Sequence, residues 1–239
     1  MVKSKNRYKD QLDIITIDGP AGSGKSTVAK MLSRELGLKY IDTGATYRTL
    51  TLLALQNRIE PDDESSILKL AQKSKIELES NPKDELQDTI VKLNGKDVTD
   101  DIRSSRVGAS VSIVSKLSGI RKYLVSLQRE LADSGSAVLE GRDTGSVVFP
   151  NALLKIYLSA GIEERVRRRE LQNIQKGQKV DAKNIKTEIS TRDSIDSTRS
   201  DSPLIIPEDA VVIDNTNLTI IQTFEKIRDI YNERIRFKN

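Results

Sequence analysis

The sequence predicts an α/β fold in which a five-stranded parallel sheet lies between two layers of helices. Three observations lead to this prediction. Short apolar runs alternate with segments of helical periodicity, as in parallel sheets whose strands are connected by helices. A glycine-rich turn, Gly19–Ser26, joins the first apolar run to the first helical segment. Further along, the pair Asn94-Gly95 favours a hairpin that would form a small antiparallel insert.

Size and composition favour a single domain over residues 1–239. A chain of 239 residues with 36% hydrophobic residues can bury one sizeable core. The sequence contains no cysteine and no histidine, which excludes disulfides, thiolate metal sites and the commonest general base. Any catalysis must therefore use Lys, Arg, Asp and hydroxyl groups.

The charge pattern points to small anionic substrates. The net charge is +4, but aromatic residues make up only 4% of the chain and are not interleaved with arginines, so nucleic-acid binding is unlikely. Met1–Asp13 is basic and polar and lacks the apolar stretch of a signal peptide, and no apolar run approaches the roughly 18 residues of a membrane span. We expect a cytoplasmic protein without membrane contact, and a monomer.

The first strands and helices follow from apolar runs and the residues that interrupt them. The first strand is expected over Ile14–Asp18, and a helix should begin at Gly24 and end at Gly37. A second strand, Leu38–Asp42, precedes a helix through Tyr47–Gln56. Three further buried strands are expected in the second half of the chain, at Ala137–Glu140, Leu153–Leu158 and Ala210–Asp214.

The remaining segments are an insert and two helix pairs. Ser80–Asp101 is polar and contains the Asn-Gly pair, so it is expected to hold the antiparallel insert. One helix pair is expected around a break at Ser118-Gly119, over Arg103–Ser118 and Gly119–Asp133. A second, densely charged pair is expected around a break at Lys176-Gly177, with helices at Glu163–Gln175 and Ala182–Thr198.

The glycine-rich turn has the residues of a phosphate-binding loop. It reads G-P-A-G-S-G-K-S, follows a predicted strand and opens a predicted helix. Its glycines allow backbone N–H groups to surround phosphate oxygens, and the helix N-terminus adds a positive dipole end. Lys25 would reach the β- and γ-phosphates, and Ser26 would bind Mg²⁺. The alternative is a turn that only resembles the motif. The residues expected around the phosphates of ATP or GTP are Gly19, Pro20, Ala21, Gly22, Ser23, Gly24, Lys25, Ser26 and Thr27.

Three segments contain arginines placed for a second phosphate group: Asp42–Arg48, Gly141–Asp143 and Arg192–Arg199. Arginine suits phosphoryl transfer because its guanidinium is planar, bidentate and permanently charged. The first two segments begin at strand ends, where open α/β sheets bind ligands. In the third, three charged residues recur at helical spacing, although a solvated salt-bridge ladder would look the same. The guanine-reading N-K-x-D motif is absent, so a switch GTPase is unlikely.

With these segments in place, the chain resembles the bacterial cytidylate kinases from Ile14 to about Ile235. The resemblance rests on four motifs in order: I-D-G-P-A-G-S-G-K-S-T, D-T-G-A-T-Y-R, G-R-D-T-G-S-V-V-F-P and R-D-S-I-D-S-T-R-S-D-S-P-L. It implies a three-layer P-loop kinase with a helical lid over ATP, residues 160–192. It also implies a region that binds the nucleoside monophosphate (NMP), residues 62–103, enlarged by the β insert. The implied reaction is transfer of the γ-phosphoryl of ATP to CMP or dCMP with Mg²⁺.

The resemblance also implies roles for individual residues. Around the acceptor phosphate it places Arg48, Arg142 and Arg199, with Arg192 and Asp196 as the ribose contact. For the base it points to Ser112, Arg121 and Asp143, and the second motif adds Thr43 and Tyr47 to the substrate site. Chemically, a carboxylate at Asp143 accepts from the N4 amino group of cytosine and repels the oxygen of uracil. The residues expected to act in catalysis are Lys25, Arg142, Arg192 and Arg199.

Several of these assignments have a simpler structural alternative. Asp143 could form a local salt bridge with Arg142, and Ser112 could be a small residue on a packed helix face. In the lid, Arg168 and Arg169 are expected over the ATP phosphates, yet a solvated basic helix paired with neighbouring glutamates is the alternative. Asn215–Thr219 could contact adenine, although turn formation and helix capping explain it equally well.

Two functional alternatives remain open at this level. One is another small-molecule P-loop kinase acting on UMP, AMP or a metabolite. The other is a non-catalytic, nucleotide-dependent module that binds RNA through the basic lid. The chain also departs from the usual family pattern at Thr46, Thr144 and Ser146, which are expected to adjust packing beside the site.

Overall fold

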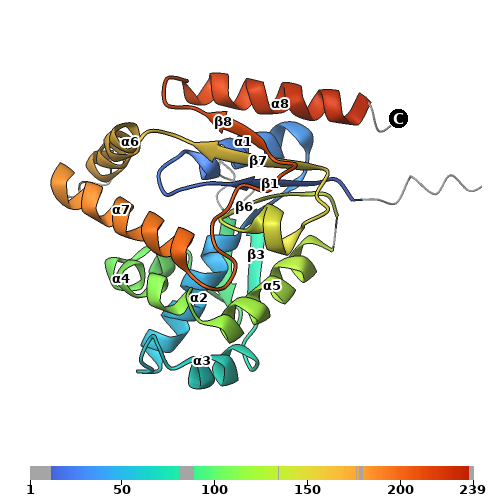
Figure 1. The fold of residues 1–239 in the computed structure, drawn as a ribbon. Coiled ribbons are helices and arrows are strands. Elements are labelled where there is room, and N and C mark those ends of the chain that lie inside the picture. Colours follow the sequence, from blue (N-terminus) through green and yellow to red (C-terminus); the bar gives the residue numbers. More distant parts are fainter. Residues whose placement is uncertain (1–11, 81–88, 134, 176, 178–179, 237–239) are drawn as a thin grey trace, which may run out of the picture.

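A computed structural model describes residues 12–80, 89–133, 135–175, 177 and 180–236. Most of the polar segment Met1–Asp13, the middle of the expected insert at residues 81–88, and Lys176 of the expected helix break lie outside the described residues. The fold is that of a central sheet with helices on both faces and an insert at one end (Figure 1). This arrangement confirms the three-layer α/β prediction.

The central sheet contains five parallel strands in the order β2-β6-β1-β7-β8. Their bounds are β1 Ile14–Asp18, β2 Lys39–Asp42, β6 Ala137–Gly141, β7 Leu154–Ser159 and β8 Val211–Asp214. Asp18 pairs with Gly141 on one side and Tyr157 on the other, and Asp42 pairs with Glu140. The strands therefore end at one common edge, and the chain segments that follow them emerge side by side there.

Each face of the sheet carries its own apolar layer. On one face, α1 (Lys25–Leu36) and α8 (Ile220–Arg236) pack on a cluster that includes Ile15, Ile17 and Leu158. On the other face lie α2 (Thr43–Gln56), α3 (Glu64–Ala71), α4 (Ser105–Val114) and α5 (Ser118–Ala132), around a larger cluster. Figure 1 shows α8 above the sheet and α2, α3 and α5 below it.

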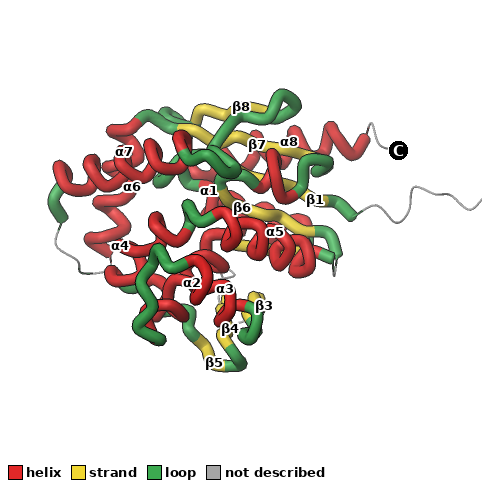
Figure 2. Tube along the Cα trace, turned by 60° about the horizontal axis from the view of Figure 1, so that its bottom comes forward, coloured by secondary structure: helices red, strands yellow, loops and turns green. Residues whose placement is uncertain are grey.

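The insert is a three-stranded antiparallel sheet in the order β3-β4-β5. It consists of β3 Ile76–Ser80, β4 Thr89–Leu93 and β5 Lys96–Asp97, and it lies below α3 in Figure 2. The hairpin between β4 and β5 turns at Asn94 and Gly95, whose φ angles are +52° and +80°. Two successive positive φ angles are what the Asn-Gly pair predicted. The insert begins earlier than expected because Ile76 and Leu78 are buried in the core.

The charged helix pair forms the expected hairpin beside the sheet edge. Its helices, α6 Ile162–Gln175 and α7 Ala182–Thr198, run side by side at the left of Figure 1. Only a small apolar contact joins them, formed by Val166, Ile185 and Ile189. Charged contacts therefore contribute much of the interaction between this hairpin and the rest of the molecule.

Three elements lay outside the sequence-based prediction. Helices α3 and α8 were not singled out from the apolar pattern, and neither was a π-helical turn at Thr144–Val148. A short 3₁₀ turn, Asp101–Arg103, connects the insert to α4. Among the described residues, no helix has the length and apolar character needed to span a bilayer.

Candidate active site

The loop between β1 and α1 is held in a conformation that only glycines allow. Gly22 and Gly24 have φ angles of +77° and +92°. At Gly19, a Cβ atom would lie 2.0 Å from the carbonyl oxygen of Leu158. The neighbouring strand β7 is thus packed directly against the first residue of the loop. The spacing of the glycines and their φ angles are both typical of a loop whose backbone N–H groups face an anion.

Lys25 is buried at the centre of this loop. Its Nζ atom donates to the carbonyl of Pro20 at 2.7 Å, and the Ser23 hydroxyl lies 3.4 Å from it. Burial, followed by repulsion from Arg142, holds the pKa of Lys25 well below its ordinary value. A polyphosphate bound in the loop would supply the opposite charge that favours the protonated form of Lys25.

Glu140, the penultimate residue of β6, places a carboxylate beside the loop. It is buried and accepts a hydrogen bond from the Tyr40 hydroxyl at 2.6 Å and another from Ser26. Burial, followed by repulsion from Asp42, raises its pKa. Sequence reasoning missed Glu140 because it treated the residue only as the end of a strand. An acidic residue at the end of a buried strand was the available signal.

A second buried carboxylate, Asp18, anchors the turn after β6. It accepts hydrogen bonds from Thr144 N–H at 3.0 Å, the Thr144 hydroxyl at 2.8 Å and Gly145 N–H at 2.7 Å. Burial raises its pKa despite these bonds. The departure from the family pattern at Thr144 therefore adds a hydrogen bond under the site, and it fixes the backbone directly after Asp143.

A second group of cations lies beside the loop and comes from the turn after β6 and from the second half of α7. Arg142 Nε donates to Asp196 Oδ2 at 2.7 Å, and Arg199 lies 3.5 Å from the other carboxylate oxygen. Burial, followed by repulsion from Arg142, lowers the pKa of Arg192 to about 10. The expected arginine-aspartate face of α7 is thus not a solvated ladder, because Asp196 is buried and pairs with β6 across the sheet edge.

Arg48 and Arg169 add further positive charge to the same group. Arg48 donates weakly to the carbonyl of Ile102 at 3.5 Å, and burial lowers its pKa, with repulsion from Arg169 as an additional cause. Arg169 also contributes to the lowered pKa of Arg192. The structure therefore brings Arg169 toward the second group of cations, whereas the sequence placed it with Arg168 over the loop.

Asp143 lies between two guanidinium groups. Arg121 NH2 is 2.5 Å from one carboxylate oxygen, and Arg199 NH2 is 3.8 Å from the other. Asp143 does not take the local pairing with Arg142 that was the structural alternative, because Arg142 binds Asp196 instead. The guanidinium of Arg121 also lies over the ring of Tyr47, 5.2 Å from its centroid.

Three buried polar atoms around Asp143 lack hydrogen-bond partners within the described part of the chain. They are Tyr47 OH, Arg121 Nε and Arg199 NH2. Burial raises the pKa of Tyr47, so its hydroxyl stays protonated and can donate. Unpaired buried donors are costly, and several around one carboxylate indicate a place for a polar ligand.

The two other expected substrate contacts have local partners. The Thr43 hydroxyl donates to the carbonyl of Glu140 at 2.7 Å. Ser112 is half-buried on α4, and its carbonyl accepts from the Ser115 hydroxyl at 3.3 Å. Arg121 donates to the carbonyl of Ser115 at 3.0 Å, which places the end of α4 beside Arg121. Ser112 therefore lies one helical turn before the residue that Arg121 contacts.

Helix α6 covers the other end of the phosphate loop. Arg168 donates to the carbonyl of Ser23 at 3.2 Å and to that of Asn215 at 2.8 Å, and Asn215 Nδ2 also donates to Ser23 at 2.9 Å. Thr219 and Gln222 exchange capping bonds at the start of α8. Asn215 contacts the phosphate loop, which leaves a contact to adenine open at this segment, while Thr219 caps α8 as the alternative expected.

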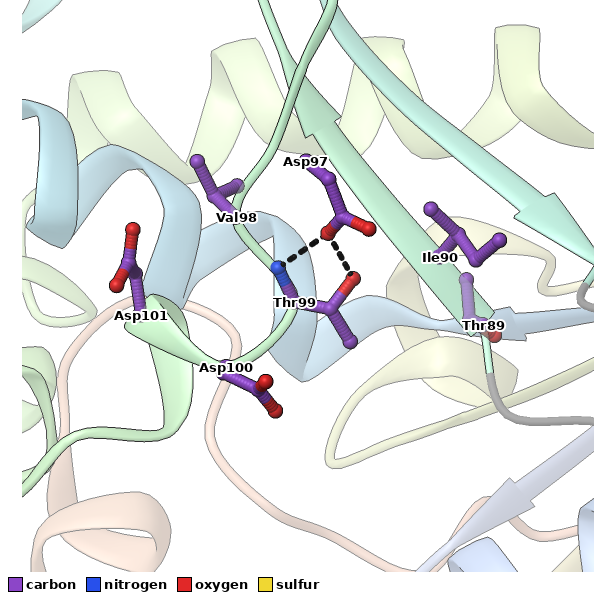
Figure 3. A pocket seen from close by; sticks show the side chains of 7 residues that line it. All are labelled: Thr89, Ile90, Asp97, Val98, Thr99, Asp100 and Asp101. Carbon is purple, nitrogen blue, oxygen red and sulfur yellow. Dashed lines mark hydrogen bonds between the residues drawn. The ribbon is translucent and has the colours of Figure 1, made fainter.

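A separate hollow lies on the insert and differs in character from this site. Figure 3 shows that β4 and the segment after β5 line it, with three aspartates among the lining residues. Asp97 accepts from the backbone N–H and the hydroxyl of Thr99, at 2.9 and 2.6 Å. An acidic lining repels phosphate groups, so this hollow does not compete with the loop and its arginines as a nucleotide site.

The chain is similar to known proteins over nearly its whole length. A family model described as cytidylate kinase matches residues 15–233. A cytidylate kinase from Geobacillus sp. (strain WCH70) is 47% identical over 221 residues, covering 92% of this chain and 97% of the relative. One from Oceanobacillus iheyensis is 47% identical, covering 91% and 93%. Among solved structures, a shikimate kinase from Acinetobacter baumannii has a TM-score of 0.44 and 14% identity, covering 93% and 94%. Because the family model and these relatives span nearly the whole chain, the chain belongs to the cytidylate kinase family.

Proposed function

We propose that this protein transfers the γ-phosphoryl group of ATP to CMP or dCMP. The observation that carries this proposal is the group around Asp143, where three buried polar atoms have no hydrogen-bond partner among the described residues. A carboxylate with donors beside it matches cytosine, whose N4 amino group donates and whose N3 and O2 atoms accept. The phosphate loop and the arginines supply places for the two phosphate-bearing ends of the substrates.

Catalysis in this proposal consists of alignment and charge neutralisation. The loop amides and Lys25 bind the phosphates of ATP, while Arg48, Arg142 and Arg199 surround the acceptor phosphate. Arg192 and Asp196 contact the ribose of the acceptor. Burial lowers the pKa values of Arg48 and Arg192, and repulsion from neighbouring arginines lowers them further, so an incoming phosphate relieves this repulsion. The acceptor phosphate has a second pKa of about 6 and is largely ionised near neutral pH, so no protein base is required.

The residues beside the loop fit a Mg²⁺ ion that arrives with ATP. Ser26 and Glu140 offer only oxygen atoms, and Mg²⁺ is usually held by one or two protein oxygens together with substrate phosphates. Among the described residues, no three or more His, Cys, Asp or Glu side chains gather into a group that could hold a metal ion. We therefore propose a site in which the ion is held jointly by the protein and the phosphates of ATP. When bound, the ion would neutralise charge on the phosphate oxygens.

Selectivity for cytosine depends on Asp143 in this proposal. Its carboxylate accepts from the amino group of cytosine, whereas uracil presents an oxygen there and is repelled. Arg121 and Arg199 hold this carboxylate in place. Arg199 thereby serves both the base and the phosphate ends of the acceptor, and Tyr47 closes the pocket from α2. Ser112 completes the pocket from α4.

We assign residues 160–192 to the lid and residues 62–103 to the NMP-binding region. The helical hairpin α6–α7 and the antiparallel insert support this division. Arg168 and Asn215 meet at the donor side of the loop, where the nucleoside of ATP would extend. We further expect the protein to act as a monomer in the cytoplasm.

An acceptor panel tests the proposed function. ADP release from ATP is measured with CMP, dCMP, UMP, AMP and small hydroxylated metabolites as acceptors. CMP or dCMP should give the highest kcat/KM. Equal or better turnover with UMP or AMP would reject the cytidylate assignment. Negligible turnover with every acceptor, together with salt-sensitive RNA binding, would instead favour a non-catalytic RNA-binding module.

A further inference from the structure

Helix α7 faces both halves of the site with neighbouring residues. Arg192 and Asp196 belong to the cation group, where Asp196 binds Arg142. Asp193, which directly follows Arg192 in the sequence, contacts the phosphate loop instead. Adjacent helical residues project about 100° apart, so one turn of α7 can contact two different sites.

Asp193 and Arg165 together clamp the apex of the phosphate loop. The backbone N–H of Ala21 donates to Asp193 Oδ1 at 3.1 Å. Arg165 NH1 donates to the carbonyl of Ala21 at 3.1 Å and forms an ion pair with Asp193. Arg165 Nε also donates to the carbonyl of Ala160, where the chain leaves β7. Both polar backbone groups of Ala21 are therefore bound by the helical hairpin.

The clamp is close-packed as well as polar. A Cβ atom at Gly22 would lie 3.2 Å from Cβ of Arg165 and 3.3 Å from its carbonyl oxygen, so α6 touches the loop backbone directly. Arg165 is also buried. A shift of the hairpin therefore cannot leave the loop apex unchanged, because interiors of this density transmit small displacements.

We propose that Asp193 and Arg165 are positioning residues that couple the acceptor site to the donor loop. This inference rests on the proposed function, because it takes the cation group to bind the acceptor monophosphate. An acceptor whose phosphate binds Arg142 and whose ribose binds Arg192 fixes α7. Fixing α7 places Asp193, and the clamp then fixes the loop apex that binds ATP. Occupancy of one site therefore strengthens binding at the other, and by linkage the effect is reciprocal.

The experiment measures this coupling without catalysis. The dissociation constant of a fluorescent, non-hydrolysable ATP analogue is determined without CMP and with saturating CMP, and the ratio is the coupling factor. Couplings of this kind are typically about 5- to 150-fold. We expect Asp193→Ala to reduce the factor to less than about twofold, while CMP alone binds with nearly unchanged affinity. Asp193→Asn keeps an acceptor for Ala21 N–H but loses the charge facing Arg165, so it should give an intermediate factor.

A matched control lies on the same two helices. Lys186 of α7 pairs with Glu163 of α6 on the exposed side of the hairpin, and neither residue contacts the loop. Lys186→Gln should therefore leave the coupling factor as in the wild type. A wild-type factor in both Asp193 variants would overturn the proposal, as would an equal loss in the control. If Asp193→Ala does not fold, Asp193→Asn alone decides between a reduced and an unchanged factor. If the wild-type protein did not bind CMP, the proposed function would be rejected instead.

Discussion

Asp143 and Arg121 form a buried ion pair, with 2.5 Å between a carboxylate oxygen and the guanidinium. The pair connects the end of β6 to α5, and Arg121 is 2% exposed. A buried pair of this kind is weak evidence for stability, because its attraction must offset the desolvation of both charges. Its place beside unpaired donors argues that it serves recognition.

Replacing Asp143 tests this role. Asp143→Asn should lower kcat/KM for CMP by at least about 30-fold, since losing a buried charged hydrogen bond costs roughly 2–5 kcal/mol. It should also narrow the preference for CMP over UMP, because an amide can donate to the uracil oxygen. The steady-state kinetics with both acceptors give these values, and ATP affinity should not change. Asp97→Asn, an acidic residue on the insert, serves as the control. An unchanged specificity constant for CMP would remove Asp143 from the base pocket.

The buried pair of Thr46 and Gln128 explains one departure from the family pattern. Gln128 Nε2 donates to the Thr46 hydroxyl at 3.1 Å, which joins α5 to α2. Thr46→Val should lower the free energy of unfolding by about 1–3 kcal/mol, because it leaves the buried amide without its acceptor. Denaturant unfolding monitored by circular dichroism provides the measurement.

Two further variants make this prediction specific. Thr51→Val makes the same change on the same helix, but the Thr51 hydroxyl donates only to the carbonyl of Tyr47, so it should cost less. The double variant Thr46→Val with Gln128→Leu should recover much of the loss, since replacing both partners by apolar groups is nearly neutral. Equal costs for the two Thr→Val changes would contradict a role for the cross-helix bond.

Glu164 gives the hairpin of α6 and α7 a defined response to acid. Hydrogen bonds from Arg167, and then from Arg168, lower its pKa to about 2 from an ordinary 4.5. A carboxyl with a lowered folded-state pKa contributes stability above its unfolded pKa and loses it as the pH falls through the folded value. The contribution should therefore fade between pH 4.5 and about 2.

The matched variant is Glu164→Gln. Its free energy of unfolding should decline less steeply than that of the wild type across this range, with a difference below about 1 kcal/mol because the pair is partly solvated. Denaturant titrations at several pH values measure both slopes. Identical slopes would mean that Glu164 is not held ionised by its arginines.

Glu140 should act on the metal and not on the nucleotide itself. Glu140→Gln is expected to raise the Mg²⁺ concentration needed for tight ATP binding by about 10-fold, a typical effect of losing a supporting carboxylate. Calorimetric titration of ATP at a series of Mg²⁺ concentrations measures the shift. Tyr40→Phe removes a hydrogen bond to Glu140 but keeps the carboxylate, so its shift should be smaller. If metal-free ATP binding weakened as much as Mg·ATP binding, a metal role for Glu140 would be ruled out.

The sequence by itself determined the features that depend on local spacing. The glycines around Lys25, the Asn94-Gly95 turn and the alternation of strands with helices each follow from backbone geometry over a few residues. Those predictions were confirmed, with small shifts at the element ends. The pattern also supplied candidate arginines that the structure brings near one another, because charged residues at strand ends and on one helix face can be identified directly.

Only the tertiary structure decided which of those residues meet. Arg142 pairs with Asp196, 54 positions away, and not with its neighbour Asp143. Asp193 reaches Ala21 across 172 positions, and Glu140 reaches Tyr40 across 100. Such pairings depend on strand order and on how the helical hairpin packs against the sheet, and no local propensity encodes either. The sequence therefore predicts which residue types the site contains, whereas tertiary packing decides which of those residues contact one another.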